Sequence, residues 1–467
     1  MRKYDLIIIG AGSGGLAAAN EASKLGLKTL LIEKNKLGGD CLWNGCIPSK
    51  TLIHEADKMR VMREENFSVD FSAHFEEVKK RIVMVQEEIS TRDSVEKYSS
   101  MGVETIIGLA KFIDKNKVKV GREKFKFKKC IVATGSRPMV PDIFKTVKYY
   151  TNENIFSIEK LPTSMTIIGG GSVGVELASS FAMFGTKIKM ILKEDRIMPR
   201  EEPEIGEFMK VKMKELGIEI FDRADVKEVF ERNGNVLVSL QSGIILESEV
   251  LVVATGRNFN TDLDLKNAGV ELGERKEVKI NDYLQTTNKK IYAIGDCNGF
   301  RLFTHAAGYQ AKAAIKNMSV PSWLPFFKQK SIPDAFPWVT YTYPEVAHVG
   351  AYKKDLIDKN ITHDVYTTNL EAVDRAQTSK VKKEGFIQVI VGRRGKILGV
   401  TIVSPHAGEL ITEWVLAMSN NLKVEAIFNT VHAYPTLSEL NPRGTFEYIN
   451  KNQNKFKFKL LKLLFKL

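Results

Sequence analysis

Cysteine is scarce in this chain, with only four among 467 residues. No stretch of about 20 consecutive apolar residues occurs, so we expect no transmembrane helix. We also expect no signal peptide, because Met1-Arg2-Lys3 leads directly into the apolar run Leu6–Ile9 and a glycine-rich turn. These features predict a cytoplasmic protein. With 43% hydrophobic residues, the chain is long enough to form two to four domains.

Acidic residues are missing from the last 17 positions, which contain six lysines: Lys451, Lys455, Lys457, Lys459, Lys462 and Lys466. The formal net charge of +13 would suggest a nucleic-acid partner. Without this tail, however, the chain carries a net charge of only about +7, spread over 450 residues. It also contains no DNA- or RNA-binding motif, and we therefore expect no nucleic-acid partner.

A strand–turn–helix pattern near the N-terminus predicts a dinucleotide site. The apolar strand Leu6–Ile9 is followed by the motif G-x-G-x-x-G, whose glycines are Gly10, Gly12 and Gly15. Glycine allows a tight turn and close approach to a pyrophosphate, which the helix N-terminus attracts. The next strand, Thr29–Ile32, ends in Glu33, at the spacing where a carboxylate accepts hydrogen bonds from a ribose diol.

The same pattern recurs in the middle of the chain. A strand over Thr166–Ile168 precedes a second glycine motif, and a helix is predicted over Val175–Phe184. The glycines of this motif are Gly169, Gly171 and Gly174. Two such units in one chain imply two dinucleotides, one flavin and one nicotinamide.

The residues after the second strand of this unit bear on the choice of nicotinamide. The strand 187–192 is followed by Lys193 instead of a carboxylate, and Arg196 and Arg200 lie close behind. Cations at this position suit the 2′-phosphate of NADPH, so we expect NADPH in preference to NADH. Solvated surface charges are the alternative interpretation, and Glu194 weakens the cationic pattern.

The segment GGDCLWNGCIPSK, residues 38–50, places two cysteines five positions apart ahead of a predicted helix. If Cys46 opens the helix and Cys41 lies in the turn before it, the two sulfurs can form and open a disulfide. A structural disulfide is the alternative, which a cytosolic location disfavours.

This segment, with the two dinucleotide units around it, resembles the redox-active disulfide of the FAD-dependent pyridine nucleotide–disulfide oxidoreductases. That family includes dihydrolipoamide dehydrogenase, glutathione reductase and mercuric reductase, and the resemblance extends from Tyr4 to about Tyr448. It implies FAD and NADPH or NADH as cofactors, and a homodimer. It also implies an α/β fold of two nested Rossmann-type FAD and NAD(P) domains plus a C-terminal α+β dimerisation domain. The expected boundaries are 1–148 for the FAD domain, 149–279 for the NAD(P) domain, 280–331 for the return to the FAD domain, 332–450 for the dimerisation domain and 451–467 for the tail.

The resemblance also implies roles for individual residues. Hydride would pass from the nicotinamide to FAD and then to the disulfide, with Cys46 nearest the flavin and Cys41 as the outer, exchanging sulfur. Lys50 would lie beside the flavin N5, with Glu176 as its ion-pair partner. Further residues match the two crossings between the nucleotide domains and the contact with the FAD ribityl chain: Thr134, Gly135, Gly256 and Asp296.

The chain departs from the family between His432 and Glu439. In the disulfide reductases of the family, a histidine before proline and a glutamate form an acid–base dyad that serves the partner subunit. Glu439 matches, but Tyr434 takes the place of the histidine and His432 lies two residues too early. A phenol with a pKa near 10 is a poor base at neutral pH, so efficient dihydrolipoamide or glutathione chemistry is not expected.

Mercuric reductases carry tyrosine at this position, but they also use a C-terminal cysteine pair to capture the metal. This chain has no cysteine after Cys297. We expect Cys130 and Cys297 to be buried small residues and expect no metal site.

The C-terminal residues 454–467 have the pattern of a basic amphipathic helix, with lysines on one face and Leu and Phe on the other. Lysines without neighbouring acids favour an anionic lipid surface, so we expect peripheral association with the inner membrane surface through this segment. Packing of the helix on its own protein, or a frayed terminus, is the alternative.

We therefore predict a homodimeric flavoenzyme that passes electrons from NAD(P)H through FAD to Cys41 and Cys46, and on to a small acceptor. The acceptor would be a disulfide, a metal ion or another small molecule, as in a mercuric-reductase-like branch. Dihydrolipoamide dehydrogenase is the alternative within the enzymes. The alternative of another class is a membrane-surface redox or scaffold protein whose tail determines its function.

Overall fold

The computed structural model describes residues 1–321, 323–452 and 464–465. The chain divides into two compact units, one of residues 1–200 and 213–332, the other of residues 201–212 and 333–467. The finer division of the first unit into FAD and NAD(P) domains stays a prediction. The amphipathic helix predicted over 454–467 lies outside the described residues, except for Leu464 and Phe465, which are exposed.

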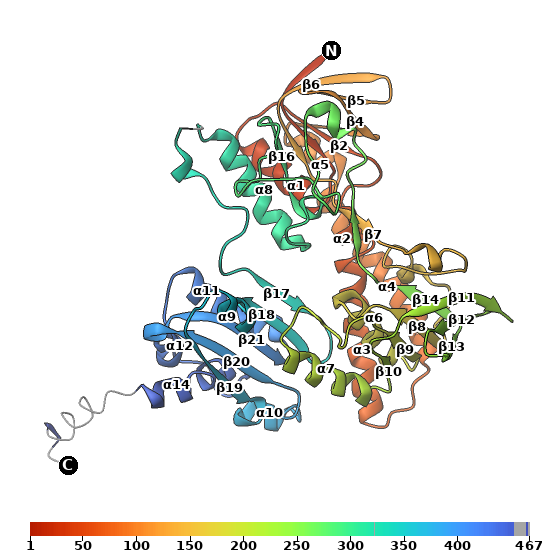
Figure 1. Cartoon of the computed structure of the whole chain (residues 1–467), viewed down its shortest axis with the longest axis vertical. Coiled ribbons are helices and arrows are strands. Elements are labelled where there is room, and N and C mark those ends of the chain that lie inside the picture. Colours follow the sequence, from red (N-terminus) through yellow and green to blue (C-terminus); the bar gives the residue numbers. More distant parts are fainter. Residues whose placement is uncertain (322, 453–463, 466–467) are drawn as a thin grey trace. The chain divides into compact units, whose positions relative to one another are not determined.

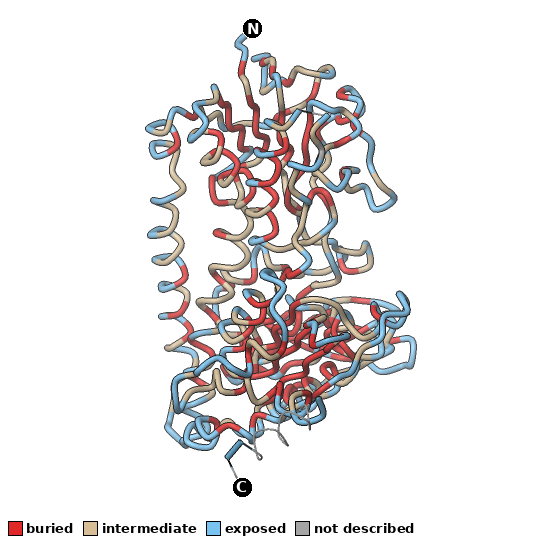
Figure 2. Tube along the Cα trace, turned by 90° about the vertical axis from the view of Figure 1, so that its left-hand side faces the viewer, coloured by how far each residue is buried: buried red, intermediate tan, exposed pale blue. Residues whose placement is uncertain are grey.

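A seven-stranded sheet forms the N-terminal part of the first unit, with strand order β3-β2-β1-β6-β5-β4 and β16 paired to β6 (Figure 1). Its strands are β1 (Arg2–Ile9), β2 (Thr29–Glu33), β3 (Val103–Ile107), β4 (Ala110–Asp114), β5 (Lys117–Val120), β6 (Glu123–Val132) and β16 (Ile291–Ala293). The strands β3, β2, β1, β6 and β16 pair in parallel. The apolar run Leu6–Ile9 of β1 and all residues of β2 and β16 are buried, as is typical of parallel strands (Figure 2).

The second dinucleotide unit contains a four-stranded parallel sheet in the order β10-β9-β8-β14. Its strands are β8 (Ser164–Ile168), β9 (Lys187–Ile191), β10 (Glu219–Phe221) and β14 (Val250–Val253). A three-stranded antiparallel sheet of β11 (Val226–Arg232), β12 (Asn235–Leu240) and β13 (Ile245–Ser248) completes this part. Two short strands, β7 (Ser136–Pro138) and β15 (Arg257–Phe259), pair antiparallel where the chain passes between the two nucleotide regions.

Two helices of the first unit, α1 (Ser13–Lys24) and α6 (Ser172–Met183), begin within the two glycine motifs. The helices of this unit also include α2 (Gly39–Trp43), α3 (Cys46–Glu64), α4 (Phe71–Ser90), α5 (Val95–Ser100) and α8 (Thr304–Ser319). Helix α6 starts three residues earlier than the predicted helix Val175–Phe184, because Gly171 is its N-cap and the second half of the glycine motif is already helical. Alanine-rich α1 and α8 pack against each other and on the first sheet, where small side chains allow close approach.

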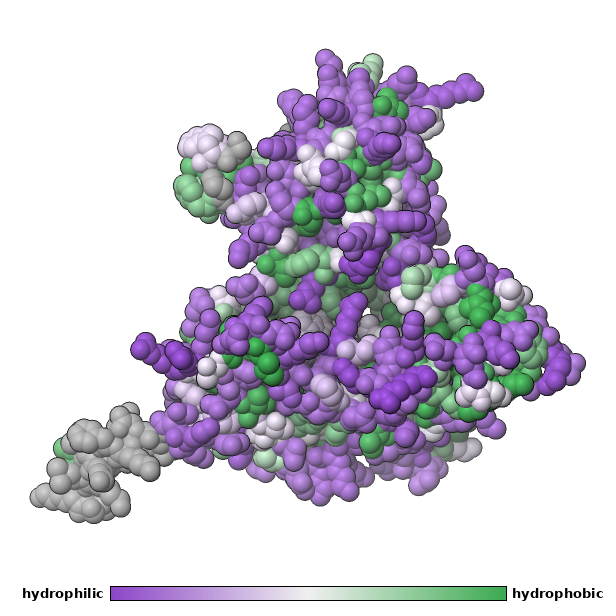
Figure 3. All heavy atoms as spheres, in the orientation of Figure 1, coloured by the Kyte–Doolittle hydropathy of each residue, from purple (hydrophilic) through white to green (hydrophobic). Residues whose placement is uncertain are grey.

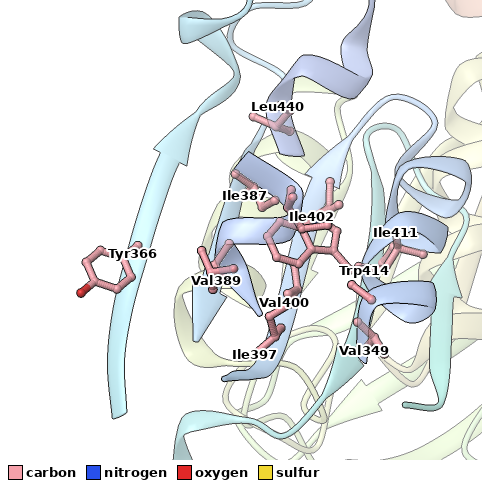
Figure 4. Close-up of a cluster of buried hydrophobic side chains, with 14 of the residues drawn as sticks. Val349, Tyr366, Ile387, Val389, Ile397, Val400, Ile402, Ile411, Trp414 and Leu440 are labelled. Carbon is pink, nitrogen blue, oxygen red and sulfur yellow. The ribbon is translucent and has the colours of Figure 1, made fainter. Parts of the chain in front are cut away.

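The second unit is built on a five-stranded antiparallel sheet in the order β17-β18-β21-β20-β19. Its strands are β17 (Pro337–Thr340), β18 (Glu345–Gly350), β19 (His363–Asn369), β20 (Phe386–Gly392) and β21 (Ile397–Ser404). Its helices are α9 (Lys353–Asp358), α10 (Asp374–Thr378), α11 (Ala407–Ser419), α12 (Val424–Asn429), α13 (Leu440–Arg443) and α14 (Phe446–Lys451), and most of α7 (Pro203–Glu215) also belongs to this unit. The fully buried Trp414 of α11 lies among aliphatic side chains of the sheet (Figure 4). One face of the sheet is thereby covered, in an α+β arrangement.

The face of the molecule in Figure 3 is mostly hydrophilic, in keeping with a chain of which 27% is charged. Among the described residues, no helix is both long and apolar enough to cross a membrane.

Candidate functional site

The cysteine segment packs directly on the first glycine motif. Gly38 and Gly39 have φ angles of +102° and +61°, which L side chains rarely adopt. A Cβ on Gly39 would lie 2.6 Å from Cα of Gly12, and the Gly38 N–H donates to the carbonyl of Ala11 at 2.9 Å. The glycine pair is thus needed both for the turn and for this close approach, which brings α2 to the predicted dinucleotide loop.

The two cysteines lie at the ends of neighbouring helices. Helix α3 begins at Cys46, as predicted, whereas Cys41 lies within the short helix α2 and not in a turn. The prediction of a turn was wrong because the left-handed Gly38 caps a helical turn that periodicity over five residues cannot reveal. Neither cysteine forms a disulfide in this structure, and the Cys46 Sγ lies 3.2 Å from the hydroxyl of Thr304.

The surroundings of the two thiols make them unequal. The pKa of Cys46 is lowered to about 6, chiefly by a hydrogen bond from Cys41, with contributions from Thr304 and the positive charge of Lys50 and against the effect of burial. The first turn of α3 also favours an anion at its N-terminus. The pKa of Cys41 is raised, by its hydrogen bond to Cys46 and by burial. At neutral pH the reduced pair therefore holds a thiolate at Cys46 and a thiol at Cys41.

The structure brings Lys50 and Glu176 together. The Nζ of Lys50, in α3, lies 2.8 Å from Oε2 of Glu176, in α6. The Glu176 side chain is only 11% exposed, so the carboxylate requires a partner. The ion pair connects the cysteine helix to the second dinucleotide unit.

The two glycine motifs have matching geometry, which fits two dinucleotides. A Cβ on Gly15 would lie 1.8 Å from the Gly10 carbonyl oxygen, and a Cβ on Gly174 would lie 2.1 Å from that of Gly169. These glycines are therefore required by the crossing of strand and helix.

The middle glycine of each motif is not required by contacts within the protein's own backbone crossing. Gly12 and Gly171 are the N-caps of α1 and α6. A Cβ on Gly171 would meet nothing within 4 Å, and one on Gly12 would meet only Gly39 at 3.7 Å. Since the protein itself does not need glycine at Gly171, the open space in front of the helix end fits an approaching phosphate.

Glu33 ends β2, as its place in the motif predicts. It is only 7% exposed, and its two carboxylate oxygens accept the backbone N–H groups of Ala11 at 2.7 Å and Asn35 at 2.9 Å. Each oxygen keeps a further lone pair, so the fixed carboxylate can still accept a ribose hydroxyl.

The predicted nicotinamide-selecting residues lie in an irregular loop after β9. Lys193 is exposed, and Arg196 pairs with Asp195 at 3.1 Å. Arg223 lies 3.8 Å from the other oxygen of Asp195. The loop is therefore mixed in charge, and Lys193 is an exposed cation two residues after the end of β9.

The predicted residues at the two chain crossings have defined local geometry. Gly135 and Gly256 adopt φ angles of +69° and +141°, and the Thr134 hydroxyl donates to the carbonyl of Asn260 at 2.6 Å. Asp296 follows β16, and burial raises the pKa of its carboxyl group.

Three side chains of this region were missed by sequence reasoning: Ser136, Arg257 and Thr304. Ser136 donates to Asp296 at 2.5 Å, and Arg257 lies 2.7 Å from Asp40, the residue before Cys41. Their positions in the sequence could have identified Ser136 and Arg257, because each directly follows an Ala-Thr-Gly segment at a predicted chain crossing, residues 133–135 and 254–256. Thr304 had no local signal, because it reaches Cys46 from a helix 258 residues away.

In the second unit, the residues of the predicted acid–base position point in different directions. The Tyr434 side chain is exposed and its hydroxyl donates to Asp374 at 3.1 Å, not to Glu439. The Glu439 Oε2 is buried without a hydrogen-bond partner among the residues that the structure describes. His432 is held by Glu413, with Nε2 2.9 Å from Oε1, and its side chain is 9% exposed. The structure thus does not pair an imidazole with Glu439.

Cys130 and Cys297 are fully buried. Within residues 1–321, 323–452 and 464–465, no three His, Cys, Asp or Glu side chains are grouped so that they could hold a metal ion.

Comparison with known proteins establishes the class. A model of the pyridine nucleotide-disulphide oxidoreductases matches residues 4–315, and a model of the dimerisation domain of these enzymes matches residues 336–442. The chain belongs to the pyridine nucleotide-disulphide oxidoreductase family. It is therefore an enzyme of a class that uses FAD and NAD(P)H, and its dimerisation domain supports a homodimer.

Individual relatives carry different activities. The chain is 33% identical over 451 residues to mercuric reductase from Lysinibacillus sphaericus, which covers 93% of this chain and 81% of the relative. It is 32% identical over 458 residues to dihydrolipoyl dehydrogenase from Chlamydia pneumoniae, covering 95% and 96%. A solved structure, the Cu(II) complex of the HOCl-induced flavoprotein disulfide reductase RclA from Escherichia coli, superimposes with a TM-score of 0.84 at 25% identity, covering 96% of this chain and 100% of that chain. Similarity thus establishes a flavoprotein disulfide oxidoreductase and leaves its acceptor open.

Proposed function

We propose that this enzyme oxidises NADPH, or NADH less efficiently, and uses the Cys41–Cys46 pair to reduce a small acceptor. The unequal thiols carry this proposal. Cys46 holds a thiolate at the start of α3, next to Thr304 and Lys50, while Cys41 keeps its proton. A pair with one thiolate and one thiol is poised for exchange, because only the thiolate attacks or donates electrons well.

The first glycine motif and Glu33 would hold FAD, and the second glycine motif and Lys193 would hold the nicotinamide nucleotide. Bound FAD would supply two-electron transfer between the nicotinamide and the cysteine pair. Lys50 and Glu176 would orient the inner cysteine, and Asp296 would accept a hydrogen bond from the flavin side chain. Thr134, Gly135 and Gly256 would shape the crossings around the cofactor.

The cysteine pair itself completes the electron balance. When Cys46 thiolate and Cys41 thiol form a disulfide, the Cys41 S–H bond breaks, one proton is released and two electrons pass to the acceptor. Reduction of the disulfide by the hydride of NADPH restores the Cys41 thiol and the Cys46 thiolate, and it oxidises the nicotinamide. The outer sulfur, Cys41, would meet the acceptor.

The C-terminal unit supports an acceptor with little need for proton transfer. Cleavage of an organic disulfide produces thiolates that must be protonated, and a positioned imidazole usually contributes 10²–10⁴-fold to such steps. Here Tyr434 replaces that imidazole and His432 is engaged by Glu413. A redox-active metal ion accepts electrons without a proton. The relatives named mercuric reductase and the Cu(II) complex of RclA make Hg²⁺ and Cu²⁺ the first acceptors to test.

Dihydrolipoamide dehydrogenase is the second candidate, for two reasons. Glu439 retains the carboxylate of the family dyad. The chain also covers 96% of the Chlamydia dihydrolipoyl dehydrogenase, against 81% of the Lysinibacillus mercuric reductase.

An anaerobic acceptor screen distinguishes these functions. The FAD-loaded protein is reduced with NADPH and mixed separately with Hg²⁺, Cu²⁺, lipoamide, glutathione disulfide and a quinone, and reoxidation is followed by absorbance. We expect the metal ions to reoxidise the protein fastest, and Cys41→Ser to abolish this step. Rapid lipoamide turnover with NAD⁺ would establish the second candidate instead. Reoxidation by every acceptor at an unchanged rate in Cys41→Ser would refute a role for the cysteine pair.

A further inference from the structure

Arg257 bridges two carboxylates beside the cysteine pair. Its Nη2 lies 2.7 Å from Oδ2 of Asp40, and its Nε lies 3.6 Å from Oδ2 of Asp296. The Nε–H donates to the Ser136 hydroxyl at 2.6 Å, and that hydroxyl donates on to Asp296 at 2.5 Å. The serine therefore links the guanidinium to the second carboxylate, and the Arg257 side chain is only 17% exposed.

The contact with Asp40 reaches the cysteines through α2. Asp40 directly precedes Cys41 in this helix, whereas Arg257 is the first residue of β15. Asn152 makes a second contact from outside the helix, with its Nδ2 3.4 Å from Oδ1 of Asp40 and 3.1 Å from the carbonyl of Asn44. Arg257 and Asn152 therefore both hold the segment around Cys41 from outside α2.

Arg257 is one of two cations among the charged side chains around the cysteine pair, so its loss would leave that region more negative. The ionised side chains from the surrounding elements are Lys50, Glu176, Asp40, Asp296 and Arg257. Lys50 offsets Glu176, and the single charge of Arg257 offsets one of the two aspartates that it contacts. Without it, two carboxylates of low exposure would oppose a thiolate in the same site.

We propose that Arg257 is a positioning residue for the redox pair, which holds the start of α2 through Asp40 and offsets the carboxylate charge beside Cys41. This inference rests on the proposed function of the cysteine pair and adds a residue that adjusts it. The reduced pair contains a thiolate, whereas the disulfide is neutral. Arg257 therefore makes the disulfide easier to reduce, and its effect exists only where Cys46 is ionised.

The test measures the equilibrium between the Cys41–Cys46 disulfide and dithiothreitol in the FAD-loaded protein, with thiols trapped by alkylation and counted by mass spectrometry. At pH values above the pKa of Cys46, Arg257→Met should lower the equilibrium constant for reduction of the disulfide about tenfold. This is the effect expected if the substitution raises the pKa of the Cys46 thiol by about one unit. Below that pKa the effect should vanish, because the reduced pair is then uncharged. Adding Asp40→Asn to Arg257→Met should return the constant to within about threefold of the wild-type value.

Arg137→Met is the matched control. Arg137 lies on β7, the partner strand of β15, and its Nη1 contacts Asn260 at 2.8 Å instead of α2. This variant should leave the equilibrium unchanged. An equal loss for Arg257→Met above and below the pKa, or a double variant no better than the single one, would show that Arg257 only supports the fold and would overturn the proposal.

Two further variants keep the proposal testable if Arg257→Met does not fold or retain FAD. Asp40→Asn alone should raise the equilibrium constant severalfold, since Arg257 is then unopposed by Asp40, and Arg257→Lys should stay within about threefold of wild type. No change in Asp40→Asn would overturn the proposal. Failure of the proposed function is a separate result, because it requires acceptor reduction that survives Cys41→Ser and Cys46→Ser.

Discussion

The Nζ of Lys50 lies 2.8 Å from Oε2 of Glu176, and this ion pair joins the first turn of the cysteine helix to the helix of the second dinucleotide unit. The two charges act on Cys46 in opposite directions, since Lys50 lowers the pKa of its thiol and Glu176 raises it. A structural contact between two helices therefore also adjusts the redox centre.

Removing Lys50 and removing Glu176 should shift the pKa of Cys46 in opposite directions. Lys50→Met should raise it from about 6, so that the thiolate is lost at a higher pH as the solution is acidified. Glu176→Gln should lower it. The rate of Cys46 alkylation, measured against pH by mass spectrometry, gives both values. Lys58→Met, which removes a lysine from the same helix that pairs with Glu55 at 3.0 Å, is the control and should change nothing. Shifts of the same sign in both variants would mean that the pair acts through packing instead of charge.

The cysteine pair should be visible in the absorbance of the flavoprotein. A thiolate next to an oxidised flavin gives long-wavelength absorbance, and Cys41→Ser should show it without any reductant because Cys46 can no longer form the disulfide. Cys46→Ser should lack it. Spectra of the two purified variants decide the matter, and two unchanged spectra would rule out Cys41–Cys46 as the redox centre.

Nicotinamide preference should depend on Lys193. Lys193→Glu should shift the ratio of kcat/KM for NADPH and NADH toward NADH by roughly ten- to a hundredfold, because a charge-assisted phosphate contact contributes roughly 1.5–3 kcal/mol. Lys187→Glu, at the exposed opposite end of β9, is the control and should leave the ratio unchanged. A ratio that does not move in Lys193→Glu would assign 2′-phosphate recognition elsewhere.

Restoring an imidazole should favour disulfide acceptors. Tyr434→His should raise turnover of lipoamide or glutathione disulfide, up to the 10²–10⁴-fold range of general acid–base catalysis, without a matching rise for metal ions. Tyr434→Phe should leave both activities unchanged, since the tyrosine hydroxyl contacts Asp374 instead of Glu439. If the wild-type enzyme already turns over dihydrolipoamide rapidly, the inference from Tyr434 is wrong.

The C-terminal residues 454–467 should bind anionic lipid. Each lysine near an anionic surface contributes about 1 kcal/mol, and salt weakens this attraction. The full chain should therefore sediment with anionic but not neutral vesicles at moderate salt, and deletion of residues 454–467 should abolish binding while FAD content and NADPH oxidation persist. Equal binding by both proteins, or loss of the FAD-loaded dimer on deletion, would indicate that the tail packs on the protein.

Local patterns were enough to locate most of the elements that form the candidate site. The strands around the two glycine motifs lie within a few residues of the predicted ranges, and α3 begins at Cys46 as expected. Each of these features depends on neighbours in sequence: a buried parallel strand needs a continuous apolar run, and a turn with positive φ needs glycine. The short helix containing Cys41 was missed because one turn has no periodicity to detect.

The sequence by itself located the cysteine pair and the two glycine motifs, because each of these patterns is formed by residues that are neighbours in the chain. The tertiary structure decided how strongly each group acts. Thr304 reaches Cys46 across 258 positions, and Arg257 reaches Asp40 across 217. His432 is engaged by Glu413 instead of serving Glu439. Such contacts follow from how sheets and helices pack, and the strength of an ionised group depends on distances and burial that exist only after packing.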